Sequence, residues 1–225
     1  MNLPRLVDTM EQRGVALVAS LLSPKDVAAL KWNLRECGFG TRDLLTRESV
    51  CRIATSPHVK TLIERLIGRG AFAVRAIWFD KTEDANWKVV WHQDRAIAVA
   101  ARLEANDFGP WSTKQGVQHT LAPAAILEGM VSLRIHLDTC DTDNAPLRVI
   151  PGSHRFGVIA ENDIAVHRRQ QETECTAEAG DAILMRPLLL HASSPSKKPG
   201  HRRVIHIEYA AHNLPNGLEW HARVS

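Results

Sequence analysis

A series of short β-like runs, separated by turns and without helices between them, is the feature of this sequence that most limits its fold. The runs begin after Ala71, and turns are marked at Gly152, Gly180 and Pro195. This pattern favours two facing sheets or a barrel over a parallel α/β sheet, whose strands alternate with helices. The strands are predicted at residues 72–80, 89–94, 130–137, 147–150, 181–185, 188–191 and 203–210.

The first seventy residues are predicted to be helical. Ser23-Pro24-Lys25-Asp26 has the composition of a helix start, with a capping serine, a proline in the first turn and an acidic residue three positions after the cap. A second helix is expected to begin at Ser56-Pro57 and to end at Gly68. We expect residues 1–225 to form one domain, in which helices at 1–70 support a β core at 71–211.

A long connection covers residues 97–129 and contains the segment Asn106-Asp107-Phe108-Gly109-Pro110. We expect an irregular, mobile loop there that covers a pocket, because loops of that length in compact domains are usually functional.

Composition excludes several classes of protein. Apolar residues make up 44% and charged residues 24%, which are ordinary globular values. The net charge of +3 is spread along the chain, so no nucleic-acid partner is expected, and no apolar window is long enough for a membrane helix. The N-terminus lacks the apolar core of a signal peptide. Because the cysteines form no Cys-x-x-Cys pair, we expect reduced thiols in a cytoplasmic protein.

His92-Gln93-Asp94 is the tripeptide that most constrains function. It follows Val89-Val90-Trp91, so the segment reads as extended, and residues two apart in a strand point to the same face. An imidazole and a carboxylate can then meet one metal ion. A second, distant histidine would complete a two-histidine, one-carboxylate triad, which suits non-haem Fe(II) that reacts with O₂. The alternative is the edge of a half-buried strand.

The second histidine is expected near the end of the β region. His191 closes an apolar run, and its alternative role is that of a hydrogen-bonded core residue. Arg202 follows eleven residues later and opens the last predicted strand. A guanidinium beside a metal site can bind a carboxylate through two parallel hydrogen bonds. The alternative for Arg202 is a surface arginine, as we interpret its neighbour Arg203.

Together these segments resemble the phytanoyl-CoA dioxygenase family of Fe(II)- and 2-oxoglutarate-dependent oxygenases. The matching residues lie in the order and at the spacing of that family, from about Phe72 to Ala210. They are Trp91-His92-Gln93-Asp94, the turn from Asn144-Ala145-Pro146-Leu147 to Ile150-Pro151-Gly152-Ser153-His154, Gly180-Asp181, His191-Ala192-Ser193 and the strand that contains Arg202.

The resemblance implies a mainly β fold with flanking N-terminal helices, namely a double-stranded β-helix (a jelly-roll, cupin-like barrel) with iron inside one mouth. It further implies that His92, Asp94 and His191 are the iron ligands and catalytic residues. Arg202 would bind the distal carboxylate of 2-oxoglutarate, and Ser132 and Ser193 are candidates for the same cluster. Trp111, with Gly116 nearby, resembles a tryptophan that walls the substrate pocket in related hydroxylases.

Several residues near these motifs carry further expectations. Ala145 stands where the family usually has glycine, so a backbone position with positive φ would be strained there. His154 is expected to be structural. Arg134 shares strand parity with Ser132 and would therefore face the interior, where it either binds an acidic substrate or pairs with Glu208. His206 is either a pocket residue or a hydrogen-bonded core histidine.

The function that these features favour is hydroxylation of a small organic molecule, with O₂ consumed and succinate and CO₂ released. Related halogenases replace the carboxylate ligand by a small residue, so Asp94 argues for hydroxylation or another oxidation such as desaturation. Two alternatives remain open: a barrel that binds a metal or small ligand without turnover, and a zinc hydrolase, since two histidines and a carboxylate also bind zinc.

Overall fold

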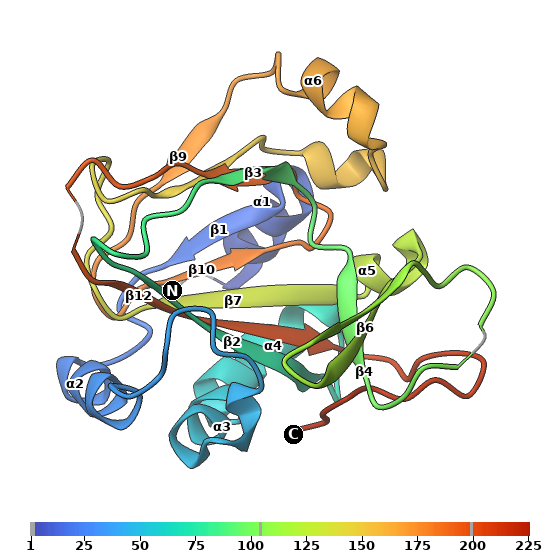
Figure 1. Ribbon diagram of the computed structural model, residues 1–225, viewed down its shortest axis with the longest axis horizontal. Helices are drawn as coiled ribbons and strands as arrows, with labels where there is room; N and C mark the ends of the chain where they lie inside the picture. The colour runs from blue at the N-terminus through green and yellow to red at the C-terminus, as the bar shows by residue number, and fades with distance from the viewer. Residues whose placement is uncertain (1–2, 104, 199) are drawn as a thin grey trace.

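Two antiparallel sheets that face one another form the centre of the computed structural model, which describes residues 3–103, 105–198 and 200–225 (Figure 1). The larger sheet contains, in spatial order, β1 (Val15–Val18), β10 (Ala182–Met185), β7 (Met130–His136), β12 (Arg202–Ala210) and β2 (Phe72–Lys81). The smaller sheet contains β3 (Val89–His92), β11 (His191–Ser193), β8 (Leu147–Val149) and β9 (Thr173–Cys175). This is the double-stranded β-helix that the sequence predicts.

Side-chain alternation explains why the larger sheet has one apolar and one polar face. In β7, Val131, Leu133 and Ile135 are buried against the helices, so Ser132 and Arg134 point to the barrel interior. The last strand follows the same rule: its apolar residues Ile205, Ile207 and Tyr209 pack with the same helices, while Arg202, His206 and Glu208 line the interior. The predicted parity of Ser132 and Arg134 on β7 is therefore confirmed.

Helices cover the outer face of the larger sheet, as Figure 1 shows. They are α1 (Leu3–Arg13), α2 (Pro24–Asn33), α3 (Glu48–Ala54) and α4 (Pro57–Ile67). The predicted start of α2 is confirmed by a reciprocal capping box between Ser23 and Asp26, and α4 ends at Gly68 as expected. None of the helices in the described ranges combines the length and apolar character needed to cross a bilayer.

Three sequence expectations about the fold are wrong. The N-terminal region is not only helical, because the short apolar run after Gly14 pairs with β10 as the edge strand β1. Residues 97–129 are not one irregular loop, because they contribute to a third sheet of β4 (Ala96–Val99), β6 (Val117–Leu121) and β5 (Trp111–Lys114), which is followed by α5 (Ala124–Glu128). Residues 188–190 form a buried turn, and the strand begins only at His191.

Asp138 joins the helical layer to the barrel through ionic contacts with Lys31 and Arg203. Its carboxylate accepts hydrogen bonds from Arg203 Nε and Nη2, both at 2.7 Å, and lies 2.7 Å from Lys31 Nζ of α2. Burial opposes its negative charge, but these two cations outweigh burial and lower the pKa of Asp138 to about 2. Because the folded-state pKa lies below the unfolded value, the resulting stability is present above about pH 4 and is lost as the pH falls towards 2.

We therefore expect Asp138→Asn to lower the free energy of unfolding at pH 7 by about 1–2 kcal/mol, after a discount for partial exposure. Urea denaturation of both proteins measures this difference, which should narrow as the pH is lowered below about 4. The matched control is Asp143→Asn, which removes a half-exposed carboxylate paired with the exposed Lys197 and Lys198 and should change stability little. A difference between wild type and Asp138→Asn that did not depend on pH would contradict the assignment.

Candidate metal centre and cofactor cavity

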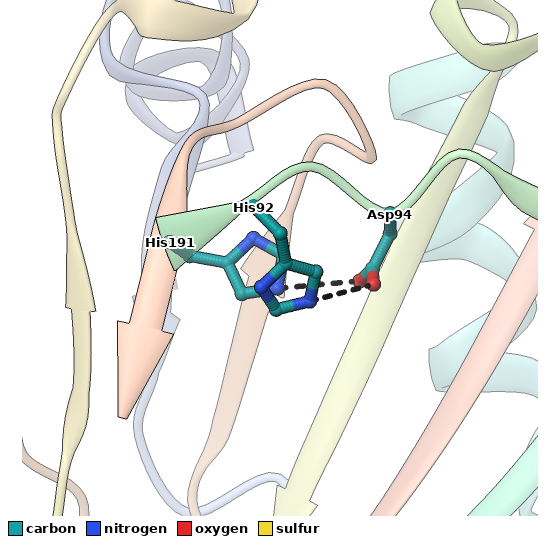
Figure 2. A group of neighbouring side chains, drawn as sticks. All are labelled: His92, Asp94 and His191. Carbon is teal, nitrogen blue, oxygen red and sulfur yellow. Dashed lines mark ion pairs between the residues drawn. The ribbon is translucent and has the colours of Figure 1, made fainter. Parts of the chain in front are cut away.

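The side chains of two histidines and an aspartate point towards one another (Figure 2). His92 ends β3 and His191 begins β11, and the two are direct partners in the register of the smaller sheet. Asp94 lies just beyond β3, where its backbone N–H donates to Pro187 O at 2.9 Å. Its two carboxylate oxygens lie 3.6 Å from His92 Nε2 and 3.6 Å from His191 Nε2. One candidate ligand atom from each residue lies within 4.8 Å of the other two.

Backbone carbonyls hold both imidazoles in the orientation that a metal requires. His92 Nδ1 lies 2.8 Å from Val90 O, and His191 Nδ1 lies 2.8 Å from Leu189 O. A proton on Nδ1 satisfies each carbonyl and leaves the lone pair of Nε2 directed towards Asp94, as in metal-bound histidines. This donor set of two imidazoles and one carboxylate fits Fe(II) in a site with open positions.

The electrostatics of the triad favour ligand-ready protonation states. Burial lowers the pKa of His191 to about 4, so its imidazole is neutral at pH 7. Burial opposes the charge of Asp94, but His191, His92 and His206 together hold the pKa of that carboxyl well below its usual range. For His92, the hydrogen bond and charge of Asp94 outweigh burial and raise the pKa. A metal ion, which competes with protons, thus meets a charged carboxylate and a neutral His191.

A cavity of about 480 Å³ extends from the triad between the two sheets. Its apolar lining includes Ile77, Phe79, Trp87, Val89 and Leu147. The remaining lining is strongly cationic, and Arg202 is among the most deeply buried of these residues, with 4% of its surface exposed. A volume of this size accommodates a small organic molecule.

Arg202, Ser193 and Lys81 form a polar cluster at one end of this cavity. Arg202 Nη1 donates to Ala145 O and lies 3.4 Å from Ser193 Oγ. Lys81, opposite Arg202 in the strand register, donates to Ser193 Oγ at 3.1 Å and to Ser194 O at 2.6 Å. Ala145 has φ +54°, so the predicted backbone strain is present, and it lies at the residue whose carbonyl binds Arg202.

Arg134 lies near this cluster and has no carboxylate partner among the described residues. Its Nη1 lies 3.1 Å from His206 Nδ1, while burial and the charge of Arg202 lower the pKa of Arg134 to about 10. Glu208 instead pairs with Arg75 and lies 3.4 Å from His206 Nε2. Of the two alternatives for Arg134, the pair with Glu208 is therefore wrong, because that carboxylate pairs with Arg75 of β2. His206 lines the cavity and is also hydrogen bonded.

Buried donors without partners show that this part of the barrel fits an anion. Among the described side chains, Nε of Arg202 and Nε of Arg134 are buried and make no hydrogen bond, and neither ring nitrogen of His136 does. Leaving such groups unpaired costs free energy, which a carboxylate bound between the two guanidiniums would recover. The residues present thus fit 2-oxoglutarate as well as the metal.

Two predicted site residues are not brought to the cavity. Ser132 faces the barrel interior but lies opposite Glu208 in the register of β7 with β12, and Glu208 is six residues along β12 from Arg202. It is therefore distant from Arg202, and Ser193 is the serine that joins the cluster. Trp111 is half-buried against the apolar cluster beneath the third sheet and does not line the cavity. This position makes it a hydrophobic anchor.

His154, predicted to be structural, lies outside the triad. Its Nε2 is 3.1 Å from Glu11 O of α1, and its ring packs over Gly14.

Sequence reasoning missed Lys81, Arg42 and Lys114. Lys81 is 1% exposed, and burial lowers its pKa to about 7. A lysine at the end of a mostly apolar strand, opposite Arg202, could have indicated it. Arg42 and Lys114 line the cavity from a loop and from the third sheet, and no motif marks either residue.

Comparisons with known proteins agree with this geometry. The family model described as Phytanoyl-CoA dioxygenase (PhyH) matches residues 10–204. The chain is 26% identical to an ectoine dioxygenase of Nocardia farcinica, over 90% of this chain and 76% of that protein. It is 24% identical to an L-proline trans-4-hydroxylase of Streptomyces griseoviridis, over 72% of this chain and 63% of that protein.

Solved structures share the fold. EctD from S. alaskensis with 2-oxoglutarate and 5-hydroxyectoine superposes with a TM-score of 0.70 at 19% identity, covering 92% of this chain and 75% of that one. The epimerase SnoN in complex with Fe³⁺, alpha ketoglutarate and nogalamycin RO gives a TM-score of 0.69 at 17% identity, covering 96% and 91% of the two chains.

Proposed function

Because the chain belongs to the phytanoyl-CoA dioxygenase family, we propose that the protein hydroxylates a small organic substrate in this cavity. The iron would be held there by His92, Asp94 and His191. The protein is an Fe(II)- and 2-oxoglutarate-dependent oxygenase. The observation that carries the assignment of residues is that the triad and Arg202 line one cavity, with the Nε2 atoms of both histidines directed at Asp94.

Each residue group has a separate task in the proposed mechanism. His92, Asp94 and His191 would hold Fe(II) as its three protein ligands, a donor set that suits chemistry with 2-oxoglutarate and O₂. Arg202 and Ser193 hold the distal carboxylate of 2-oxoglutarate, with Arg134 nearby as a further cation. When bound, iron with 2-oxoglutarate and O₂ supplies an oxidant strong enough to break a substrate C–H bond and releases succinate and CO₂.

The apolar wall contributes by excluding water from this oxidant. Phe79 and Trp87 line the cavity, and Trp87 is positioned by Phe39, whose ring centroid lies 6.0 Å away. Where water is excluded, the oxidant reacts with the substrate and not in side reactions.

We further propose that the helical layer and the β core act as one catalytic domain, because a shared apolar cluster joins them. A cytoplasmic location stays a prediction, supported by four free cysteines.

A metal-substitution assay tests this function. The purified protein is loaded anaerobically with Fe(II) or with Zn(II), supplied with 2-oxoglutarate and a metabolite extract, and exposed to ¹⁸O₂. We expect succinate release only with Fe(II), and mass spectrometry should find a metabolite that has gained one ¹⁸O atom. Hydrolysis products with Zn(II), without succinate, would indicate a zinc hydrolase. Tight metal binding without any turnover would indicate a binding protein.

A further inference from the structure

The charges that line the cavity are unbalanced. Six cationic side chains face it, against the carboxylates of only Asp94 and Glu208 among the described lining residues. The cations are Arg42, Arg75, Arg95, Lys114, Arg134 and Arg202. Fe(II) and the 2-oxoglutarate dianion cancel one another's charge, so the cofactors leave the excess of four positive charges unchanged.

Two groups of these cations already have roles. Arg75 is paired with Glu208, and Arg202 and Arg134 lie together at the part of the cavity assigned to 2-oxoglutarate. Arg42 and Lys114 remain, with Arg95 beside Asp94 as a further cation. Arg95 has a buried Nε that makes no hydrogen bond.

Arg42 and Lys114 are held together by hydrogen bonds between the segments that carry them. The backbone N–H of Arg42 donates to Gln115 Oε1 at 3.0 Å, and Gln115 Nε2 donates to Gly40 O at 3.4 Å. Gln115 directly follows Lys114 at the tip of the β5–β6 hairpin. The Arg42 loop is tied to the barrel in turn, because Trp78 N donates to Thr41 O at 2.8 Å. The fold therefore fixes both cations at the same cavity.

Neither Arg42 nor Lys114 has a carboxylate in direct contact among the described residues, although the more distant charges of Glu208 and Asp94 favour the two cations. No salt bridge joins either side chain to an acidic residue in the described ranges, and neighbouring Asp43 lies 3.4 Å from His221 Nε2 instead. Burial, followed by the charge of Arg75, lowers the pKa of Arg42. Burial, followed by the charges of Arg42 and Arg75, lowers the pKa of Lys114. Cations placed together without a partner repel one another, and a bound anion would relieve that repulsion.

We propose that Arg42 and Lys114 form a subsite for an anionic group, a carboxylate or a phosphate, on the primary substrate. The body of that substrate lies against the apolar wall of Phe79 and Trp87 and presents a C–H bond to the metal. This inference rests on the proposed function and names the class of its substrate as a compact organic acid.

Direct binding tests the subsite without knowledge of the natural substrate. The protein is loaded with Mn(II) and saturating 2-oxoglutarate, so that Arg202 is occupied, and is titrated calorimetrically with benzoate, phenylphosphonate and benzamide. These probes share one aromatic ring and differ in the head group. The variants are the double substitution Arg42→Gln with Lys114→Gln, the charge-retaining Arg42→Lys, and Arg65→Gln as an exposed control outside the cavity.

We expect wild type to bind benzoate or phenylphosphonate at least about tenfold more tightly than benzamide. The double variant should lose about tenfold or more in affinity for the preferred anion and keep its affinity for benzamide, whereas Arg42→Lys and Arg65→Gln should resemble wild type. Preference for benzoate identifies a carboxylate substrate, and preference for phenylphosphonate a phosphate ester. Equal binding of all three probes, no binding of either anion, or unchanged anion affinity in the double variant would each overturn the proposal.

The assay does not depend on turnover. A protein that binds benzoate through Arg42 and Lys114 but releases no succinate would contradict the proposed function while leaving the anion subsite supported.

Discussion

His191→Ala and His92→Ala should each bind Fe(II) at least about a hundredfold more weakly than wild type, because each removes one of the three protein ligands that we propose. Loss of even a group that orients a ligand typically weakens metal binding by about 10–100-fold, so loss of a ligand should cost no less. Anaerobic equilibrium titration with Fe(II), or with Mn(II) as a redox-stable substitute, measures the affinity. Wild type should bind one ion per chain.

His154→Ala is the matched control for these variants. It also removes a half-buried histidine that bonds a backbone carbonyl, but that histidine lies against α1 and not in the triad. Its metal affinity should equal that of wild type. If all three histidine variants bound Fe(II) as tightly as wild type, the assignment of His92 and His191 as ligands would be wrong.

The fold was largely predictable because its central strands carry strong local patterns. β7 and β12 alternate apolar and polar residues, and β2 is buried along most of its length. β5 offers no such signal: after Trp111 its residues are exposed, so the segment reads as a loop although it pairs with β6. The run at residues 188–190 fails in the opposite way. It is apolar because the turn is buried, and burial alone does not distinguish a turn from a strand.

The candidate site was predictable only where its residues lie close together on short segments. His92 and Asp94 are two residues apart, and Arg202 follows His191 by eleven residues. Strand parity correctly predicted that Ser132 faces the barrel interior, but parity does not predict how far along the barrel axis a residue lies. The register of β7 with β12 sets that depth, and it separates Ser132 from Arg202.

Contributions from distant segments were not predictable at all. Arg42 comes from a loop after α2, and Lys114 comes from an inserted sheet; they meet only because the β5–β6 hairpin docks on that loop through Gln115. A contact of this kind depends on tertiary packing between segments 73 positions apart, for which a single sequence shows no local pattern.

Arg202→Ala should weaken 2-oxoglutarate binding by about 2–5 kcal/mol and leave metal binding intact, because it removes the buried cation that we propose as the partner of the distal carboxylate. Calorimetric titration of 2-oxoglutarate into Mn(II)-loaded protein measures this loss. Arg203→Ala is the control: Arg203 alternates to the other face of β12 and is bound by Asp138, so its loss should lower stability without changing 2-oxoglutarate affinity. If instead Arg203→Ala lost the affinity, the register of β12 would be shifted by one residue.

Thermal unfolding separates a binding role of Arg202 from a structural one. Arg202 is buried with no carboxylate in salt-bridge contact among the described residues, and its Nη1 donates to Ala145 O and Ser193 Oγ. Its removal relieves an uncompensated buried charge, so the free protein should unfold at the same temperature as wild type or higher. Saturating 2-oxoglutarate should raise the unfolding temperature of wild type but not of Arg202→Ala, since a ligand stabilises only the protein that binds it. An Arg202→Ala protein that was destabilised when free and still stabilised by 2-oxoglutarate would show that Arg202 is a structural residue.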